Sequence, residues 1–319
     1  MNTTHYKYEQ PRTKQSPPIT TLEPTKNAGH GDHWAIVSHD FVNDLPAWLE
    51  TSLQSATVPE ALANCKTRDN HLLISTNDTC HIKQILSLEN GTPKHLLNVF
   101  PAVNSPYGMT CRITAATVCD DTQDAILHLS TPDGTMLYAF DQLYSINHCH
   151  YDSQIDYYVN FSAWAYNFTK SNQDEVILVD DPASIRYHRA FNDVVAANNG
   201  QVPHDLDARI KAWRPDSDEP LAPVEINLGH SCIYLFGETH GQQDEAWCQG
   251  QVLGKSHTDF FGQDITLFDV VILREPDADP FVVRIATPTT DDTAAIEVQD
   301  YIQANIWLQA AIYASNQKV

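Results

Sequence analysis

The sequence predicts an α+β protein built from two tandem, diverged copies of one unit, each with an N-terminal strand and helix packed on an antiparallel β-sheet. Three observations lead to this prediction. Short motifs recur in the same order in the two halves, each half opens with an apolar run followed by a helical pattern, and the remainder of each half is rich in β-branched residues and turn signals. In such a unit the helix covers one face of the sheet.

The repeat is clearest near the end of each half. The first half reads DYYVNFSAWAYNFTKSNQ from Asp156, and the second reads DYIQANIWLQAAIYASNQ from Asp300, 144 residues later. Shorter matches fall in the same order at this offset, and their ordered clustering supports a duplication because identity elsewhere is low. We therefore predict a flexible arm at residues 1–30, a first repeat unit at 31–173 and a second at 174–319.

Each half is expected to begin with a strand and a helix and to continue as a sheet. Short apolar runs predict the strands, and apolar side chains at helical spacing predict the helices. In the first half the strand, the helix and the sheet segments fall at residues 34–37, 39–56, 81–100, 110–118, 124–140 and 156–173. In the second half the corresponding segments are residues 176–179, 182–200, 222–236, 246–254, 268–286 and 300–317.

Turn residues divide these segments into hairpins. Asn90-Gly91 and the Pro-Asp-Gly run at 132–134 each separate two strand-like runs, which is typical of tight turns. Gly229 is expected to turn a further hairpin within 222–236. The helix of the second half is expected to end at Gly200, since glycine tolerates the left-handed conformation that closes many helices.

The last strand of the first half changes phase along its length. Tyr157 and Phe161 lie on one face, whereas Trp164 and Tyr166 continue the alternation one residue out of step. Such a slip predicts a β-bulge or a bend. We interpret the aromatic side chains as core rather than as a ligand platform. The matching segment at 300–317 fits either a strand or a helix.

Composition limits the classes of partner. The chain has 41 acidic and 19 basic residues and a net charge of −22, which opposes direct binding to nucleic acid and favours a basic protein partner. No apolar stretch is long enough for a membrane span, and the N-terminus lacks the apolar segment of a secretory signal, so a cytoplasmic location is expected. Seven dispersed cysteines indicate reduced thiols.

The sequence NHCHY suggests a first candidate site. His148 and His150 are two residues apart and, on a strand, would point to the same face, where two imidazoles can bind a transition metal. A third ligand would have to come from elsewhere, such as His128 or Asp152. With fifteen histidines in the chain, an accidental pair is also a ready explanation.

A second candidate site lies in FGETHGQQDEAWC. This segment concentrates three carboxylates and one imidazole, at Glu238, His240, Asp244 and Glu245. A carboxylate beside an imidazole can act in general acid/base catalysis or bind zinc. His257 and Asp259 follow the next predicted strand and are candidates to join them in space. The same composition is typical of a solvated loop.

Two functions remain open from the sequence. The first is an intracellular, acidic, non-catalytic binding or protein-interaction protein built by internal duplication. The alternative is a metal-assisted hydrolase with its site in the C-terminal unit. The chain has no phosphate-binding loop, dinucleotide-binding glycine motif or HExxH motif, so no cofactor-binding residue is assigned, and both the cofactor and the presence of enzymatic activity stay undecided.

Overall fold

The chain has a mixed α+β fold that groups into two compact units. The computed structural model describes residues 19–23, 30–62, 71–119, 121–172, 176–215, 222–227, 229, 231–236, 242–274 and 279–313. One unit comprises Met1–Ser171 together with Cys232–Val319, and the other comprises Asn172–Ser231. The second unit is therefore inserted into the first. This grouping follows contacts and not ancestry, so the two repeat units stay a prediction.

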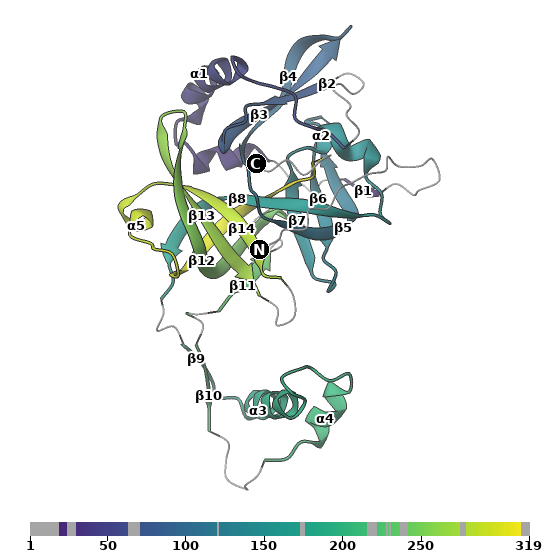
Figure 1. Cartoon of the computed structure of the whole chain (residues 1–319), viewed down its shortest axis with the longest axis vertical. Coiled ribbons are helices and arrows are strands. Elements are labelled where there is room, and N and C mark those ends of the chain that lie inside the picture. The colour runs from purple at the N-terminus through teal and green to yellow at the C-terminus, as the bar shows by residue number, and fades with distance from the viewer. Residues whose placement is uncertain are drawn as a thin grey trace. The chain divides into compact units, whose positions relative to one another are not determined.

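A ten-stranded sheet forms most of the first unit, and it closes on itself twice (Figure 1). Its main strands are β5 (Gly108–Cys119), β6 (Asp124–Ser130), β7 (Met136–Asp141), β8 (Asp156–Lys170), β12 (Glu245–Phe260), β13 (Gln263–Leu273), β14 (Phe281–Pro288) and β15 (Tyr301–Ala311). The first closed sheet runs β5-β6-β7-β15-β8 and returns to β5. The second runs β12-β13-β14-β8-β15 and returns to β12. Strands β8 and β15 belong to both.

The two closed sheets have the same order of elements. In each, three antiparallel strands are followed by a short helix and a fourth strand; the helices are α2 (Tyr144–Asn147) and α5 (Asp291–Ala294). Strand β15 pairs in parallel with β7, and β8 pairs in parallel with β14. Strands β8 and β15 pair antiparallel, so the two repeated sequence stretches lie side by side, with Trp164 opposite Trp307.

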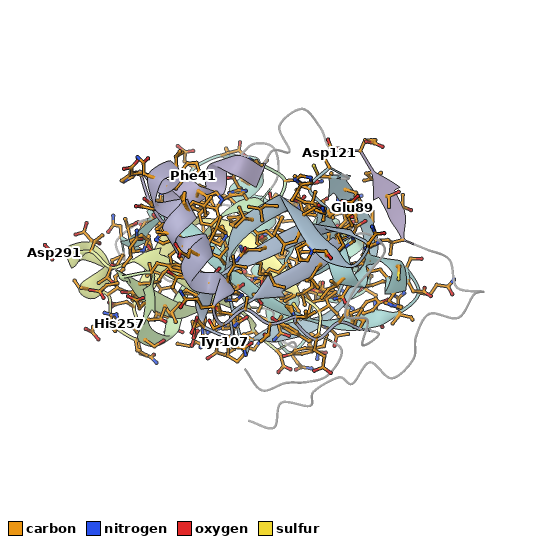
Figure 2. All side chains as sticks on the ribbon, turned by 90° about the horizontal axis from the view of Figure 1, so that it is seen from above. Phe41, Glu89, Tyr107, Asp121, His257 and Asp291 are labelled. Atoms are coloured by element: carbon orange, nitrogen blue, oxygen red, sulfur yellow. The ribbon has the colours of Figure 1, made fainter. Side chains whose placement is uncertain are left out.

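Short strands extend the ten-stranded sheet, and a smaller sheet packs against it. Strand β1 (Thr20–Leu22) pairs with β5, and β11 (Ile233–Phe236) pairs with β12. The three-stranded sheet consists of β2 (His71–Ser75), β3 (Cys80–Glu89) and β4 (Thr92–Val103). It lies near η1 (His30–Ile36) and α1 (Phe41–Leu53), as Figure 1 shows and as Figure 2 shows from above.

The core is divided between the two faces of the strands. One cluster joins one face of the strands of both closed sheets, including Ile113, Leu127 and Val270. The opposite face of β8 and β15 carries Trp164 and Trp307 into a second cluster with α1, η1 and the three-stranded sheet. Strands buried on both faces read as nearly continuous apolar runs, which is why periodicity alone left 300–317 ambiguous. That segment is a strand where it is described, up to the end of β15.

The second unit packs two helices with a two-stranded ribbon. Its elements are β9 (Val176–Val179), α3 (Pro182–Ala197), α4 (Leu206–Ala212) and β10 (Val224–Asn227), with β9 and β10 antiparallel. Helix α3 begins after Asp181, whose carboxylate accepts a hydrogen bond from the Ser184 N–H at 2.8 Å. The chain leaves the helix at Asn199 and Gly200, both with positive φ, as the glycine predicted.

Local signals predicted several elements correctly. Asn90 and Gly91 both have positive φ, at 53° and 77°, and close the β3–β4 hairpin. The phase slip in β8 is a bulge: Asn305 pairs with Asn167 and Ile306 with Ala165, so Tyr166 is the extra residue.

Two elements were predicted wrongly. Residues 34–37 lie in a 3-10 helix and the turn after it, not in a strand, and the Trp34 ring packs against Phe41 and Trp48 of α1. Residues 222–236 do not form a hairpin, because β10 pairs with β9 in the second unit while β11 pairs with β12 in the first. Packing on the following helix overrode the local pattern in the first case, and pairing with two separate strands overrode it in the second.

Candidate functional site

The His148–His150 segment does not have the predicted strand conformation. It forms a 3-10 turn, η2 (His148–His150), directly after α2, so alternation along a strand does not place the two rings on one face. His148 Nδ1 is 3.1 Å from the Tyr144 carbonyl oxygen, and the His150 carbonyl oxygen accepts a hydrogen bond from the Tyr157 hydroxyl. Within the described part of the chain, no group of three His, Cys, Asp or Glu side chains could hold a metal ion.

The proposed third ligands have other partners. His128 Nε2 is 3.0 Å from Thr117 Oγ1, and burial lowers the pKa of His128. Asp152 is buried, and one of its carboxylate oxygens accepts a hydrogen bond from the Gln154 N–H at 2.8 Å. His128 and Asp152 therefore hydrogen-bond to residues close to them in the chain.

The second candidate segment is only partly described. Glu238 and His240 lie outside the described residues, whereas Asp244 and Glu245 immediately precede and open β12. Both carboxylates make contacts with segments far away in the sequence. The site can therefore be built around this pair.

Glu245 belongs to a short chain of hydrogen-bonding groups. The Tyr166 hydroxyl donates to Glu245 Oε1 at 2.5 Å and also contacts His33 Nδ1. Glu245 Oε2 accepts the Gln242 N–H at 2.6 Å. Tyr166 is the bulge residue of β8, and the bulge lets its side chain leave the alternation of the strand and reach both partners.

Asp244 is linked to His33 of this hydrogen-bonded chain through Trp307. Its carboxylate accepts a hydrogen bond from Trp307 Nε1 at 2.7 Å, and the Trp307 ring stacks on the His33 ring with centroids 4.0 Å apart and planes 4° apart. Burial raises the pKa of Asp244 to about 7, although the Trp307 hydrogen bond opposes the shift. We call His33, Tyr166, Asp244, Glu245 and Trp307 the Tyr166 cluster.

The Tyr166 cluster has the order of groups needed to pass a proton. When Glu245 is ionised and accepts from the Tyr166 hydroxyl, the phenol oxygen can accept from a protonated His33 Nδ1. His33 is fully buried, whereas Tyr166 is 40% exposed, so the chain of groups runs from the interior to the surface. This arrangement is suited to general acid/base chemistry.

His257 and Asp259 do not join Asp244 and Glu245. They lie at the other end of the long strand β12, twelve residues beyond Glu245, which is roughly 40 Å along an extended strand. Asp259 accepts hydrogen bonds from the Gly262 N–H in the β12–β13 turn. The predicted proximity to this carboxylate pair is therefore wrong, because one strand spans the whole segment.

The β12–β13 turn instead forms part of an acidic surface. Asp259 lies directly opposite Asp264 in the ladder, and the Asp264 carbonyl oxygen accepts the Thr289 N–H just before α5. Helix α5 opens with Asp291 and Asp292. We call Asp259, Asp264, Asp291 and Asp292 the acidic patch; all four are exposed, and none makes an ion pair with another described residue. Figure 2 shows His257 and Asp291 on this side of the molecule.

A third group of ionisable residues is buried away from these sites. Lys83 of β3 and Asp141 of β7 are 2% and 1% exposed. Burial lowers the pKa of Lys83 to about 7 and raises the pKa of Asp141 to about 7. The Tyr151 hydroxyl and the Leu143 N–H donate to the Asp141 carboxylate. Nothing in the sequence pattern distinguished this pair.

Sequence reasoning found the two carboxylates of the Tyr166 cluster but missed its aromatic members. The phase slip in β8 was a usable signal for Tyr166, whereas His33 lies more than a hundred residues away and carries no local signal. Comparison with family models, with curated proteins and with solved structures finds no match. Among the described helices, none has the length and apolar character to cross a membrane.

Proposed function

We propose that the protein is an acidic, non-catalytic interaction protein whose acidic patch binds a basic protein partner. The observation that carries the proposal is a set of four exposed carboxylates at one edge of the second closed sheet, none of them in an ion pair with a described residue. A net charge of −22 extends the field of this patch and steers cationic partners toward it.

The patch has an energetic feature that a partner would relieve. Asp259 and Asp264 are cross-strand neighbours of the same charge, an arrangement that destabilises a hairpin. A partner's lysine or arginine side chain bound between the two carboxylates would offset this repulsion. The two carboxylates at the start of α5 lie beside the turn through the Thr289–Asp264 hydrogen bond and enlarge the target.

We further infer that the two closed sheets arose by internal duplication. The inference is supported by their equal order of strands and helices and by the pairing of β8 with β15, the strands that carry the repeated sequence. Duplication would have placed two similar surfaces in one chain. All four residues of the acidic patch lie in the second copy.

The test uses charge-neutralised variants of the full chain. Partners captured by the wild-type protein are purified, and their association rates are measured against increasing salt concentration. Because steering is screened by salt, the rate should fall steeply, and the variant with Asp259, Asp264, Asp291 and Asp292 changed to Asn should lose about tenfold or more in rate.

A matched control carries the same change in charge elsewhere. It replaces exposed carboxylates with amides at Glu50, Asp121, Asp207 and Asp279. This variant should keep most of the association rate. A captured partner whose rate ignores salt, or an equal loss in both variants, contradicts the proposal.

One observation favours a second candidate function, acid/base hydrolysis at the Tyr166 cluster, in which Glu245 comes from the predicted C-terminal unit and His33 and Tyr166 come from the first unit. The hydrogen-bonded order His33, Tyr166, Glu245 provides the groups for proton transfer at an accessible phenol. A metal-assisted form of this function predicts stoichiometric metal in protein purified without an affinity tag. Sub-stoichiometric zinc, manganese, iron, nickel and copper would remove that form.

A further inference from the structure

The second unit contains a groove between α3 and the β9–β10 ribbon. Its volume is about 470 Å³; Leu178, Pro223 and Val224 supply the smaller, apolar part of its lining, and the larger, polar part includes His188 and Asn192 of α3. Val224 is buried, whereas Leu178 is 57% exposed. The groove therefore presents one exposed apolar side chain, that of Leu178, in a largely polar lining, and it is too open to enclose a small ligand.

Two opposite charges border this groove and are not paired with each other. Arg189 projects from α3, and Glu225 belongs to β10. Both side chains are exposed, and neither has a hydrogen bond or an ion pair within the described part of the chain. A ligand that complements the groove therefore carries a negative and a positive group on either side of an apolar one.

The ribbon beside the groove has unused strand edges. Strands β9 and β10 pair only with each other among the described residues, so each presents an outer row of backbone N–H and C=O groups. Val176 and Leu178, two residues apart on one face of β9, are 46% and 57% exposed. A two-stranded ribbon is stabilised when a third strand or further apolar contact is added.

We propose that this groove binds an extended peptide segment of a partner protein, which adds a strand to the β9–β10 ribbon. The bound segment places an apolar side chain against Leu178, a basic side chain against Glu225, which is the cross-strand neighbour of Leu178, and an acidic side chain against Arg189. Backbone hydrogen bonds supply affinity, and alternate side chains supply specificity, as in other cases of strand addition. The proposal does not depend on the acidic patch.

Selection from a random peptide library displayed on phage tests the proposal with the full-length protein. Wild-type protein should enrich peptides in which an acidic and a basic residue flank an apolar residue. Leu178→Asp should weaken the binding of the selected peptides by about tenfold or more, because the apolar contact becomes a buried charge. Leu253→Asp is the matched control, since Leu253 is an exposed leucine of β12 outside the groove, and it should bind normally.

Charge-reversal variants test separately the two charged residues that border the groove, Arg189 and Glu225. Arg189→Glu should end the preference for an acidic residue and keep the preference for a basic one, and Glu225→Lys should do the converse. Enrichment that is the same for wild type and Leu178→Asp, or charge preferences unchanged by both reversals, overturns the proposal. The acidic-patch variant should select the same peptides as wild type, so this proposal and the proposed function can fail separately.

Discussion

Single residues in this protein are most informative where a charge is buried. Lys83 and Asp141 come from different sheets of the first unit, and each is almost completely removed from water. Burial disfavours the charged form of both groups, so both pKa values lie at about 7. His81, two residues before Lys83, is also buried. Its pKa is lowered mainly by burial and, to a smaller extent, by the charge of Lys83.

Replacing Lys83 with methionine should change the pH dependence of stability. In the folded protein the pKa of Lys83 is about 7, against 10.5 for an unperturbed lysine, so the unfolded chain binds the extra proton between these values. Wild-type stability should therefore rise with pH across this window, and Lys83→Met should lose that rise. Below about pH 7 Asp141 is protonated and no longer offsets the buried ammonium, so the variant should be more stable there by about 1 kcal/mol or more.

Urea unfolding at about pH 6 and about pH 9 measures this effect on the free energy of unfolding. Lys94→Met is the matched control, because Lys94 is half exposed and pairs with Glu89 at the surface. The control should leave the pH profile unchanged. Parallel profiles for Lys83→Met and wild type would show that the buried amine does not titrate in this range.

Tyr166→Phe tests the Tyr166 cluster at the same scale. The change removes one hydroxyl that contacts both His33 and Glu245, and we expect a loss of about 1 to 3 kcal/mol in the free energy of unfolding. Tyr187→Phe, at an exposed tyrosine of α3, should cost less than about 0.5 kcal/mol. A neutral result at Tyr166 would mean that the hydrogen bonds are replaced by water without cost.

At the scale of elements, the β12–β13 hairpin contains two carboxylates, Asp259 and Asp264, whose mutual repulsion should lower its stability. Asp264→Asn should stabilise the protein by a few tenths of a kcal/mol, because it removes the repulsion from Asp259 across the ladder. Thermal unfolding at low and high salt should show a gain that shrinks as salt screens the repulsion. Under the proposed function the same variant should bind a basic partner more slowly. A loss of stability would indicate that the Asp264 carboxylate makes a favourable contact.

Elements whose signals are local were predictable from the sequence. The Asn90-Gly91 turn requires positive φ at both residues, and these residue types allow it, so the β3–β4 hairpin followed directly. The β8 bulge was visible because alternation records which face each residue occupies. By contrast, WAIV has the composition of a strand, but packing of Trp34 on α1 holds it in a 3-10 helix and the following turn.

The candidate site also depends on contacts between distant segments, which a local sequence pattern does not reveal. Asp244 and Glu245 stood out as neighbouring carboxylates, whereas their partners Tyr166, Trp307 and His33 come from three other segments. No local pattern states which distant strand will lie beside β12. The cluster could therefore be anticipated only from its carboxylates and from the phase slip at Tyr166.

At the scale of the whole molecule, each of the two closed sheets needs a strand of the other to close. Strands β8 and β15 take part in both closed sheets, so neither set of four strands closes without a strand from the other. A repeat in the sequence predicts two similar units, but it does not predict that they share strands. The inserted second unit, by contrast, has its own helices and its own two-stranded sheet.

Deleting residues 172–231 should leave the first unit folded. The ends of the insertion lie near each other, because the Ser171 hydroxyl donates to the Gln249 side chain and Ile233 pairs with Gln249 in the sheet. A short Gly-Ser linker can therefore join Ser171 to Cys232. The melting temperature of the deleted chain should stay within a few degrees of wild type. As a control, a deletion extended to Phe236 also removes β11 and its hydrogen bonds to β12, and it should melt at a lower temperature. If the shorter deletion alone abolishes cooperative unfolding, the two units are not independent, and the groove would have to be studied as part of a single cooperative structure.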